Sequence, residues 1–452
     1  MQKEDTGNWS VVIYRVVTSG YFLPLCLILA FLVRLFWILA VPADPVEDCK
    51  AYYDGGLDIA NGNGYVNHEV PTAYWPVGYP LLLAGIFTLF GQSLFVAKFT
   101  NVVLYTGTII LSYYVAKKEF GSEIAGRITA FILSLYPTHI AYMSLLTADN
   151  IVLFFIMLGL VFLMIDRHKI FLSIASGLVF GFATLVKAQV IFLPLLFFIL
   201  YSRRNIRNIR NKTLRIYTVR FVLVYVFLFI CLLPWFVRNY SVFKHFPVIS
   251  TNGGINLLIG NNPYATGGYF WEENVRSLIG DYSGEFDRNQ KAKNIAVNYI
   301  INHPIQIKLW WNKLENLYAS DWVGVRWNVG GLRGKHYNVV TYYSLFVVYY
   351  AGPIIYKIIF VGFLVSVIVV LFMYVYGKYF KKFPALSLWV IIYFTIISLV
   401  FFGEPRFHFP LVPWMVMYIG GVAEFILRPS EGGHTEGVEN STSRFPFTMM
   451  SV

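Results

Sequence analysis

Charged residues are scarce in this chain of 452 residues, since Asp, Glu, Lys and Arg together make up only 13% of it. Soluble domains carry about 25% charged residues. This low content of charged residues, together with 57% hydrophobic residues, excludes an ordinary soluble domain. Many of them form apolar runs of about 20 residues, the length with which a helix crosses a bilayer. The composition therefore predicts an all-α polytopic membrane protein.

Other absences narrow the function. The three cysteines form no disulfide or zinc framework, because Cys26 and Cys231 fall inside apolar runs and Cys49 stands alone. The sequence has no Walker or dinucleotide-binding glycine fingerprint, which argues against a nucleotide site. It has no internal repeat of the kind found in many transporters. Residues 1–20 are polar and mixed and no small-residue cleavage site follows the first apolar run, so we expect that run to remain as a signal anchor.

The net charge of +12 would suit a nucleic-acid-binding protein, but the positions of the basic residues favour another explanation. They cluster in short loops between apolar runs, at 116–121, 166–169, 203–215 and 377–383. Basic loops of membrane proteins stay on the cytoplasmic side and contact anionic lipids. We therefore expect membrane lipids, and no nucleic acid, as partners.

The apolar runs predict about ten transmembrane helices. They cover approximately residues 21–41, 95–116, 124–142, 149–166, 170–187, 188–202, 219–237, 354–376, 386–403 and 407–427. A break at "VKAQV" separates the fifth helix from the sixth. The apolar stretch from Gly78 to Gly91 is too short to span, so we expect it to lie at the interface or to re-enter the membrane.

With both termini in the cytoplasm, this helix count places every dense basic cluster on the cytoplasmic side. The outer side then receives residues 42–94, 136–149, 238–353 and 403–410. We expect a protein of the plasma (inner) membrane. Its N-terminal half would consist of a cytoplasmic N-terminus (1–20) and a transmembrane module (21–237) with an acidic first outer loop (42–94). An extracytoplasmic segment (238–353), C-terminal transmembrane helices (354–427) and a disordered cytoplasmic tail (428–452) would follow. Residues 288–318 look helical, and the glycosylation sequon at Asn440 lies on the wrong side to be used.

The stretch "VPADPVEDCKAYYDGGLDIANGNGY" (Val41 to Tyr65) contains five carboxylates directly after the first apolar run. We expect three of them to be solvated or structural: Asp44, Asp54 and Asp58. Glu47 and Asp48 lie nearer the end of the helix and are followed by Tyr52 and Tyr53. Partial desolvation at a membrane interface raises the pKa of a carboxylate, which can then act as a base near neutral pH.

A second outer acid, Asp149, stands in "LLTADN" at the start of a helix. There Asp149 or Thr147 could cap the helix N-terminus, and a cap would also point at the outer cavity. Arg34 lies inside the first predicted helix. It is either functional or an inward-facing partner for one of the acids.

Three cations lie on the outer face, against the positive-inside rule: Lys187, Arg238 and Arg406. Arg406 stands in "GEPRFHFP" with Glu404 and His408. One such cation alone would be interpreted as a snorkelling residue at the interface. Three together favour a cationic pocket beside the acidic loop, as a phosphate leaving group needs. Nucleotide-activated sugars are not expected on this side of the membrane, so an activated group must arrive there on a lipid phosphate. The 18% of aromatic residues suit sugar stacking as well as an ordinary membrane belt.

Four stretches carry a resemblance to a known family. They are "EDCKAYYDGGLDIANGNGY" with the following "PTAYWPVGYPLLLAGIFTLFG"; "YPTHIAYMSLLTADN"; "PWFVRNYSVFKHFPVISTNGGINLLIGNNP"; and "EPRFHFPLVPW". Over residues 20–415 the chain resembles the integral-membrane, inverting glycosyltransferases of the GT-C superfamily. It is similar to bacterial relatives of protein O-mannosyltransferases and of the aminoarabinose transferase that acts on lipid A.

The resemblance implies roles for individual residues. Asp48 matches the catalytic base, a role that the adjacent Glu47 could take, and Asp149 matches a second acid that is often Glu in relatives. Arg406 matches a position near the donor phosphate, and Arg238 and Lys187 are further candidates for that contact. The expected substrate contacts are Tyr52, Tyr53, Tyr79, Glu404 and His408. Acceptor recognition would fall to residues 238–353.

The sequence therefore predicts transfer of a sugar from a polyprenyl-phosphate donor to a lipid, glycan or protein acceptor, with inversion at the anomeric carbon. Asp48 would take the proton of the attacking hydroxyl, and the cations would stabilise the leaving phosphate. No cofactor is expected to be obligatory, although Glu47 and Asp48 are oxygen ligands that leave a divalent cation open. The alternatives are a glycan polymerase or ligase that uses polyprenyl-diphosphate donors, and a lipid or sugar transporter.

Overall fold

The computed structural model describes residues 9–165, 169–205, 211–245, 249–376 and 383–427. The predicted tail with Asn440, and parts of three basic loops (166–168, 206–210 and 377–382), lie outside the described residues. The described chain is mainly helical, with one short antiparallel ribbon of β1 (Val66–Asn67) and β2 (Val70–Pro71). The predicted all-α polytopic fold class is confirmed.

The helices follow in chain order. The first half contains α1 (Trp9–Thr18), α2 (Phe22–Ala40), α3 (Asp48–Ala60), α4 (Gly78–Phe90), α5 (Leu94–Phe120), α6 (Glu123–Leu135), α7 (Pro137–Ala141), α8 (Ala148–Ile165), α9 (Ile170–Val186), α10 (Leu193–Asn205) and α11 (Asn211–Phe243). The second half contains α12 (Gly253–Gly260), α13 (Glu273–Arg276), α14 (Glu285–Asn302), α15 (Ile307–Leu317), α16 (Val323–Gly331), α17 (Val339–Val375), α18 (Leu386–Val400) and α19 (Val412–Leu427). Short 3₁₀ turns are η1 (Tyr142–Ser144), η2 (Ala188–Phe192), η4 (Ser277–Ile279) and η5 (Pro405–Leu411).

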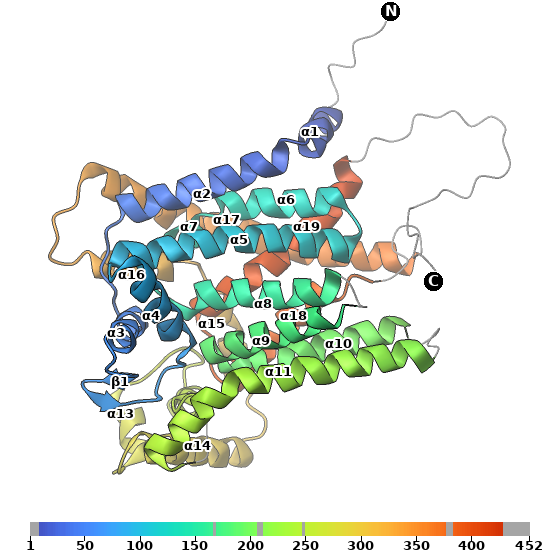
Figure 1. Cartoon of the computed structure of the whole chain (residues 1–452). Helices are drawn as coiled ribbons and strands as arrows, with labels where there is room; N and C mark the ends of the chain where they lie inside the picture. Colours follow the sequence, from blue (N-terminus) through green and yellow to red (C-terminus); the bar gives the residue numbers. More distant parts are fainter. Residues whose placement is uncertain (1–8, 166–168, 206–210, 246–248, 377–382, 428–452) are drawn as a thin grey trace, which may run out of the picture.

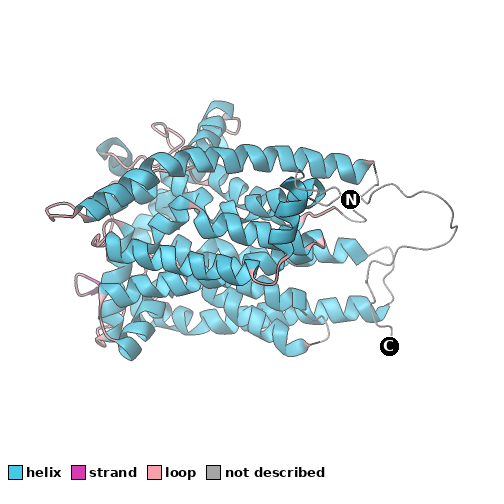
Figure 2. Cartoon of the chain, turned by 90° about the horizontal axis from the view of Figure 1, so that it is seen from above, coloured by secondary structure: helices cyan, strands magenta, loops and turns pink. Residues whose placement is uncertain are grey.

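Six helical stretches of the described chain are long and apolar enough to cross a membrane: Phe22–Ala40, Leu94–Phe120, Ala148–Ile165, Arg215–Phe243, Val339–Val375 and Pro405–Leu427. Four shorter apolar helices accompany them: Gly78–Phe90, Ile170–Val186, Ala188–Leu200 and Leu386–Val400. The long helices lie side by side with similar directions in both views (Figures 1 and 2). The last span is the most enclosed of the C-terminal ones, with Trp414 among the largest fully buried side chains.

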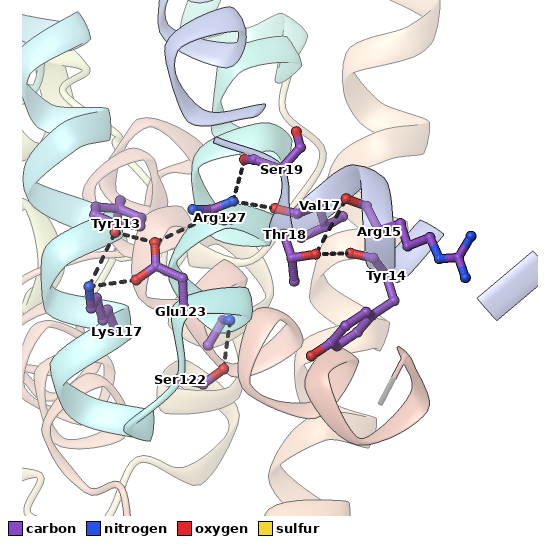
Figure 3. A network of polar contacts seen from close by, with 11 residues as sticks. Tyr14, Arg15, Val17, Thr18, Ser19, Tyr113, Lys117, Ser122, Glu123 and Arg127 are labelled. Atoms are coloured by element: carbon purple, nitrogen blue, oxygen red, sulfur yellow. Dashed lines mark hydrogen bonds and ion pairs between the residues drawn. The ribbon is translucent and has the colours of Figure 1, made fainter. Parts of the chain in front are cut away.

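The two ends of the bundle differ. α1 and the C-terminal end of α19 lie at one end in Figure 1, whereas α3, the β1–β2 ribbon, α13 and α16 lie at the other. At the first end, Figure 3 shows how α1 is tied to the α5–α6 turn. Arg127 donates to the carbonyls of Val17 (2.7 Å) and Ser19 (2.6 Å), while Glu123 joins Arg127 to Lys117. The acidic segment 42–94 is therefore on the end opposite to this basic network.

One predicted span is broken. The expected helix 124–142 ends as α6 at Leu135, because Pro137 lacks an N–H and forces Tyr136 into an extended conformation (φ −66°, ψ 113°). The open carbonyls at this break are taken by Arg34, whose guanidinium donates to Leu133 O (2.7 Å) and Ser134 O (2.8 Å). Arg34 thus binds backbone carbonyls rather than a carboxylate, and its buried Nε has no hydrogen-bond partner among the described residues.

Two helices are longer than the apolar runs predicted. α11 continues to Phe243 and α17 begins at Val339, although each contains a proline, Pro234 and Pro353. A proline inside a long packed helix removes one hydrogen bond without ending the helix, which sequence reading cannot foresee. The predicted break at "VKAQV" is present, because Lys187 is extended (φ −144°, ψ 113°) between α9 and η2.

The residues between α11 and α17 form a small unit against the acidic segment 42–94. α12, α14 and the 273–279 turns enclose a separate apolar core that includes Ile255, Leu258 and Val275. The predicted helical stretch 288–318 is two helices, α14 and α15, separated around Pro304. Glu285 at the start of α14 accepts from Thr72 Oγ1 (2.9 Å) and Ala73 N (2.7 Å), and so fixes this unit to the loop that carries the acids.

Candidate active site

A cavity of about 530 Å³ lies between the acidic segment 42–94, the start of α8, the α9–η2 junction, α12, α18 and η5. Its charged lining residues are Asp48, Asp149, Lys187 and Arg406. Its neutral polar lining includes Thr147, Gln189, Ser250, Asn252, Asn256, Tyr393 and Ser398. Its apolar lining includes Val186, Phe192, Phe394, Ile397, Phe401 and Phe402. The cavity therefore joins a charged end to an apolar side built from helices of the bundle.

Asp48 and Arg406 meet in this cavity from opposite ends of the sequence. Asp48 stands in the first turn of α3, and its Oδ2 accepts from Arg406 Nη1 at 2.6 Å, while Oδ1 accepts from Trp75 Nε1 at 3.3 Å. The Asp48 side chain is 34% exposed and that of Arg406 is 17% exposed. Arg406 also donates from Nε to Glu404 (2.8 Å), and its Nη2 has no hydrogen-bond partner among the described residues.

Glu47, the neighbouring acid, is placed differently. It precedes α3 with a positive φ of 49° and is exposed, and it does not line the cavity. Positive φ is uncommon outside glycine, and here it marks the sharp change of direction at the start of α3. Of the two adjacent candidates, the structure brings only Asp48 into the cavity.

Asp149 and Lys187 form a second ion pair in the same cavity. Asp149 lies in the first turn of α8, where the helix dipole favours a negative charge. Its side chain is 5% exposed and that of Lys187 is 14% exposed. Lys187 Nζ also lies 5.6 Å from the centre of the Phe407 ring. Thr147 does not act as a side-chain cap, since its buried Oγ1 has no partner in the described chain.

Aromatic residues form one wall of the cavity. Tyr52 lines it and packs on Tyr79, with ring centres 5.6 Å apart, so Tyr79 lies behind the wall and donates to Asn101 (3.0 Å). Tyr74 also lines the cavity, and burial raises its pKa to about 12, so it is a neutral hydroxyl at physiological pH. Tyr53 points elsewhere and packs edge-on against Phe87 (5.6 Å).

Three further sequence candidates do not line the cavity. Arg238 donates to the backbone carbonyls of Thr72 and Tyr65, both at 2.8 Å, and thereby clamps the ends of the β1–β2 ribbon. Glu404 contacts the cavity only through Arg406. His408 is fully buried and faces away from the cavity.

Several lining residues were not singled out from the sequence. Trp75, Gln189, Asn252, Asn256 and Trp271 reach the cavity from four separate segments. Trp75 follows the acidic loop in "TAYWP" and could have been suspected as a sugar-stacking residue. The amides carry no local signal, because nothing in a single sequence indicates that α12 and η2 face the same space.

The described residues contain no group of three or more His, Cys, Asp or Glu side chains placed to hold a metal ion. The two lining carboxylates are each paired with a cation, so the four charged lining residues have no net formal charge. Metal independence stays a prediction.

A multi-pass membrane protein with paired acids and cations in a half-apolar cavity has the parts of a glycosyltransferase that uses lipid-linked donors. Residues 75–235 match the family model described as dolichyl-phosphate-mannose-protein mannosyltransferase. The match includes the cavity residues Trp75, Asp149 and Lys187. It confirms the resemblance to integral-membrane glycosyltransferases of the GT-C superfamily.

Solved structures similar to this chain include two crystal structures of ArnT from Cupriavidus metallidurans. The one bound to undecaprenyl phosphate is 15% identical, with a TM-score of 0.40, over 90% of this chain and 77% of that chain. The one in the apo state is 14% identical, with a TM-score of 0.37, over 89% of this chain and 76% of that chain. No curated protein sequence matches the chain.

Proposed function

We propose that the protein transfers a sugar from a polyprenyl-phosphate-linked donor to a hydroxyl acceptor at the extracytoplasmic face of the membrane, with inversion at the anomeric carbon. One observation carries the proposal: a single cavity combines two carboxylate–cation pairs with an apolar side formed by α18 and η2. A polyprenyl phosphate has the matching chemistry, because its phosphate needs cations and its chain needs an apolar surface.

The extracytoplasmic position rests on the distribution of charge. The described end that carries α1 also carries Lys117, Lys118 and Arg127, whereas the cavity lies beside the acidic segment 42–94 at the other end. Basic residues mark the cytoplasmic side of membrane proteins. The donor therefore approaches from the membrane at the outer end, and the neutral amides of the cavity are available to sugar hydroxyls.

In the proposed reaction, the acceptor oxygen forms a bond to the anomeric carbon while the bond from that carbon to the phosphate oxygen breaks. The electron pair of the broken bond leaves on the polyprenyl phosphate, and the hydroxyl proton passes to Asp48. The charge that grows on the leaving oxygen is stabilised by Arg406, whose Nη2 is unpartnered in the described chain, and by Lys187. Glu47 does not take part.

Because Asp48 is paired with Arg406, binding of the donor can prepare Asp48 to act as the base. Arg406 binds Asp48, and the phosphodiester monoanion of the donor would compete for the same guanidinium. As Arg406 turns toward the phosphate, Oδ2 of Asp48 loses a donor and can accept from the acceptor hydroxyl. Trp75 still holds Oδ1 and keeps the carboxylate in place.

The test is transfer by the purified protein in lipid nanodiscs, with synthetic polyprenyl-phosphate sugars and a panel of lipid, glycan and peptide acceptors, followed by mass spectrometry. Asp48→Asn is expected to insert and fold normally but to lose about 10²–10⁴-fold in turnover, the usual contribution of a general base. Glu47→Gln is the matched control and should keep turnover. Normal transfer by Asp48→Asn would exclude it as the base. Transfer from polyprenyl diphosphates alone would favour the polymerase or ligase reaction instead.

A further inference from the structure

Arg288, in the first turn of α14, is a half-buried cation beside the cavity that lacks an anionic partner. Its guanidinium carbon lies over two aromatic rings, 5.6 Å from the centre of Trp271 and 5.3 Å from that of Tyr282. Within the described chain it forms no ion pair, and its buried Nε donates to no acceptor. Aromatic faces attract a guanidinium and orient it, but they leave its N–H groups available to an anion.

The carboxylates nearest to Arg288 along α14 are engaged elsewhere. Glu285 accepts hydrogen bonds from residues 72–73, and Asp287 pairs with Lys291 at 3.2 Å. Neither carboxylate is within ion-pair distance of the guanidinium. The positive charge of Arg288 is therefore not neutralised by its own helix.

The first turn of α14 is fixed against two segments that line the cavity. Oδ1 of Asn289 accepts from Gly254 N at 2.6 Å, and a Cβ at Gly254 would clash with the carbonyl oxygen of Asn289, so α14 lies directly against the start of α12. Glu285 ties the same turn to residues 72–73, immediately before the lining residues 74–76. The guanidinium stands between these two anchors in the sequence, so its position relative to the cavity is fixed.

Aromatic rings connect Arg288 to the proposed base. Trp271 and Tyr74 line the cavity, and Tyr74 packs edge-on against Trp75 with ring centres 4.6 Å apart. Trp75 in turn donates to Asp48 at 3.3 Å. Burial raises the pKa of Tyr74, and the positive charge of Arg288 opposes that rise, as expected for a cation close to this wall. A molecule with a hydroxyl at Asp48 that extends over Trp271 would bring its next group to Arg288.

We propose that Arg288 and the ring of Trp271 form an acceptor subsite that binds a phosphate or a carboxylate, so that the sugar acceptor is an anionic hydroxyl compound. The inference rests on the proposed sugar transfer and names the class of acceptor. The donor phosphate has its own cations, Arg406 and Lys187, so the two anions do not compete. A guanidinium suits either acceptor anion, because its planar N–H pairs bind phosphate and carboxylate through two parallel hydrogen bonds.

The test compares three acceptor probes that share one skeleton. They are hexyl glucoside, which is neutral, hexyl glucuronide, which carries a carboxylate, and hexyl glucoside 6-phosphate. Binding to the full chain in nanodiscs is measured by isothermal titration calorimetry without donor, with empty nanodiscs subtracted. The charged probes should bind about 10–100-fold more tightly than hexyl glucoside, the usual contribution of a hydrogen bond to a charged group. A preference for only one charged probe would support the subsite and identify its anion.

Three variants assign the preference to the guanidinium. Arg288→Gln should remove most of the preference for charged probes, and Arg288→Lys, which keeps the charge without the planar fork, should keep a smaller one. The matched control is Arg276→Gln, an exposed arginine of the same unit that pairs with Glu273 at 3.6 Å, and it should keep the full preference. An equal loss of affinity for all three probes in Arg288→Gln would show a structural role for the aromatic contacts and exclude the anion subsite.

Transfer from a polyprenyl-phosphate sugar separates this inference from the proposed function. Binding preference that depends on Arg288, without transfer to these probes or to the acceptor panel, would overturn the proposed function and leave the anion subsite standing. Transfer with equal affinity of the wild type for all three probes would exclude the subsite and leave the function standing. Should Arg288→Gln fail to fold, Arg288→Lys decides, because an undiminished preference in that variant would exclude the guanidinium.

Discussion

The Asp149–Lys187 pair allows structure and catalysis to be separated by a double-mutant cycle. The side chains are 5% and 14% exposed, so removing either partner leaves a charge that water hardly reaches. Lys187→Met leaves Asp149 with its electrostatic interaction with Arg406 and with the dipole of α8, the latter worth about 0.3–1 kcal/mol. Loss of one partner from a buried pair costs about 3–5 kcal/mol, and we expect a value in this range for the free energy of unfolding.

Asp149→Asn should cost less than Lys187→Met. The remaining ammonium is more exposed than the carboxylate and lies 5.6 Å from the Phe407 ring centre, an attraction worth about 0.5–1 kcal/mol. The double variant has no unpaired charge, so its stability should recover to within about 1–2 kcal/mol of the wild type, as neutral replacements of buried pairs do. The coupling energy of the cycle should then exceed about 1 kcal/mol.

The assay is equilibrium unfolding in mixed micelles of dodecyl maltoside and sodium dodecyl sulfate, combined with turnover of the donor. If Lys187 stabilises the leaving phosphate, the double variant should regain stability while turnover stays about 10²-fold down. Additive losses of stability would show that the two residues are not coupled. Recovery of turnover together with stability would refute a role for Lys187 in the reaction and leave the pair a structural one.

Three other outcomes are expected. Arg238→Ala leaves two backbone carbonyls of the segment 42–94 without a donor, so it should lower the free energy of unfolding by about 1–3 kcal/mol in the same unfolding assay. In the transfer assay it should reduce turnover much less than Arg406→Ala does. Lys313 is buried and donates only to neutral acceptors, and burial lowers its pKa to about 8. Between about pH 8 and the ordinary pKa of lysine, the unfolded chain therefore keeps a proton on Lys313 that the folded chain has lost. Stability should therefore rise with pH across this window in the wild type, and a Lys313→Met variant should lack that gain in unfolding experiments. Finally, transfer should be unchanged after treatment with EDTA; a loss that Mg²⁺ or Mn²⁺ restores would contradict the expected independence from metal.

The all-α polytopic fold could be predicted because the hydropathy of a helix depends only on the residues of its own segment. The predicted helix boundaries were wrong where a single proline decides whether a helix ends. Pro137 ended a predicted span, whereas Pro234 and Pro353 stayed inside helices, since only tertiary packing tells whether a proline ends a helix.

Topology likewise placed Arg238, Arg406 and His408 on one side of the membrane but could not give the direction of each side chain. The depth of a residue in the membrane follows from hydropathy, whereas the direction in which its side chain points about the helix axis depends on the residues that it contacts. Arg238 faces the β1–β2 ribbon and His408 faces Asp321, while Arg406 alone of the three enters the cavity. A carboxylate 87 residues before His408 has no signature in a single sequence.

The pairing of every charged cavity residue suggests why an acid-rich loop follows the first span. An unpaired carboxylate beside the bilayer would be costly, and an unpaired guanidinium would bind any headgroup phosphate. Asp48 and Arg406 are paired, and under the proposed mechanism they neutralise each other until a donor phosphate draws the guanidinium away. In the proposed reaction the base is then uncovered only when the leaving group is in place. Selection of the donor from other membrane phospholipids would fall to the neutral amides and aromatic rings around the sugar.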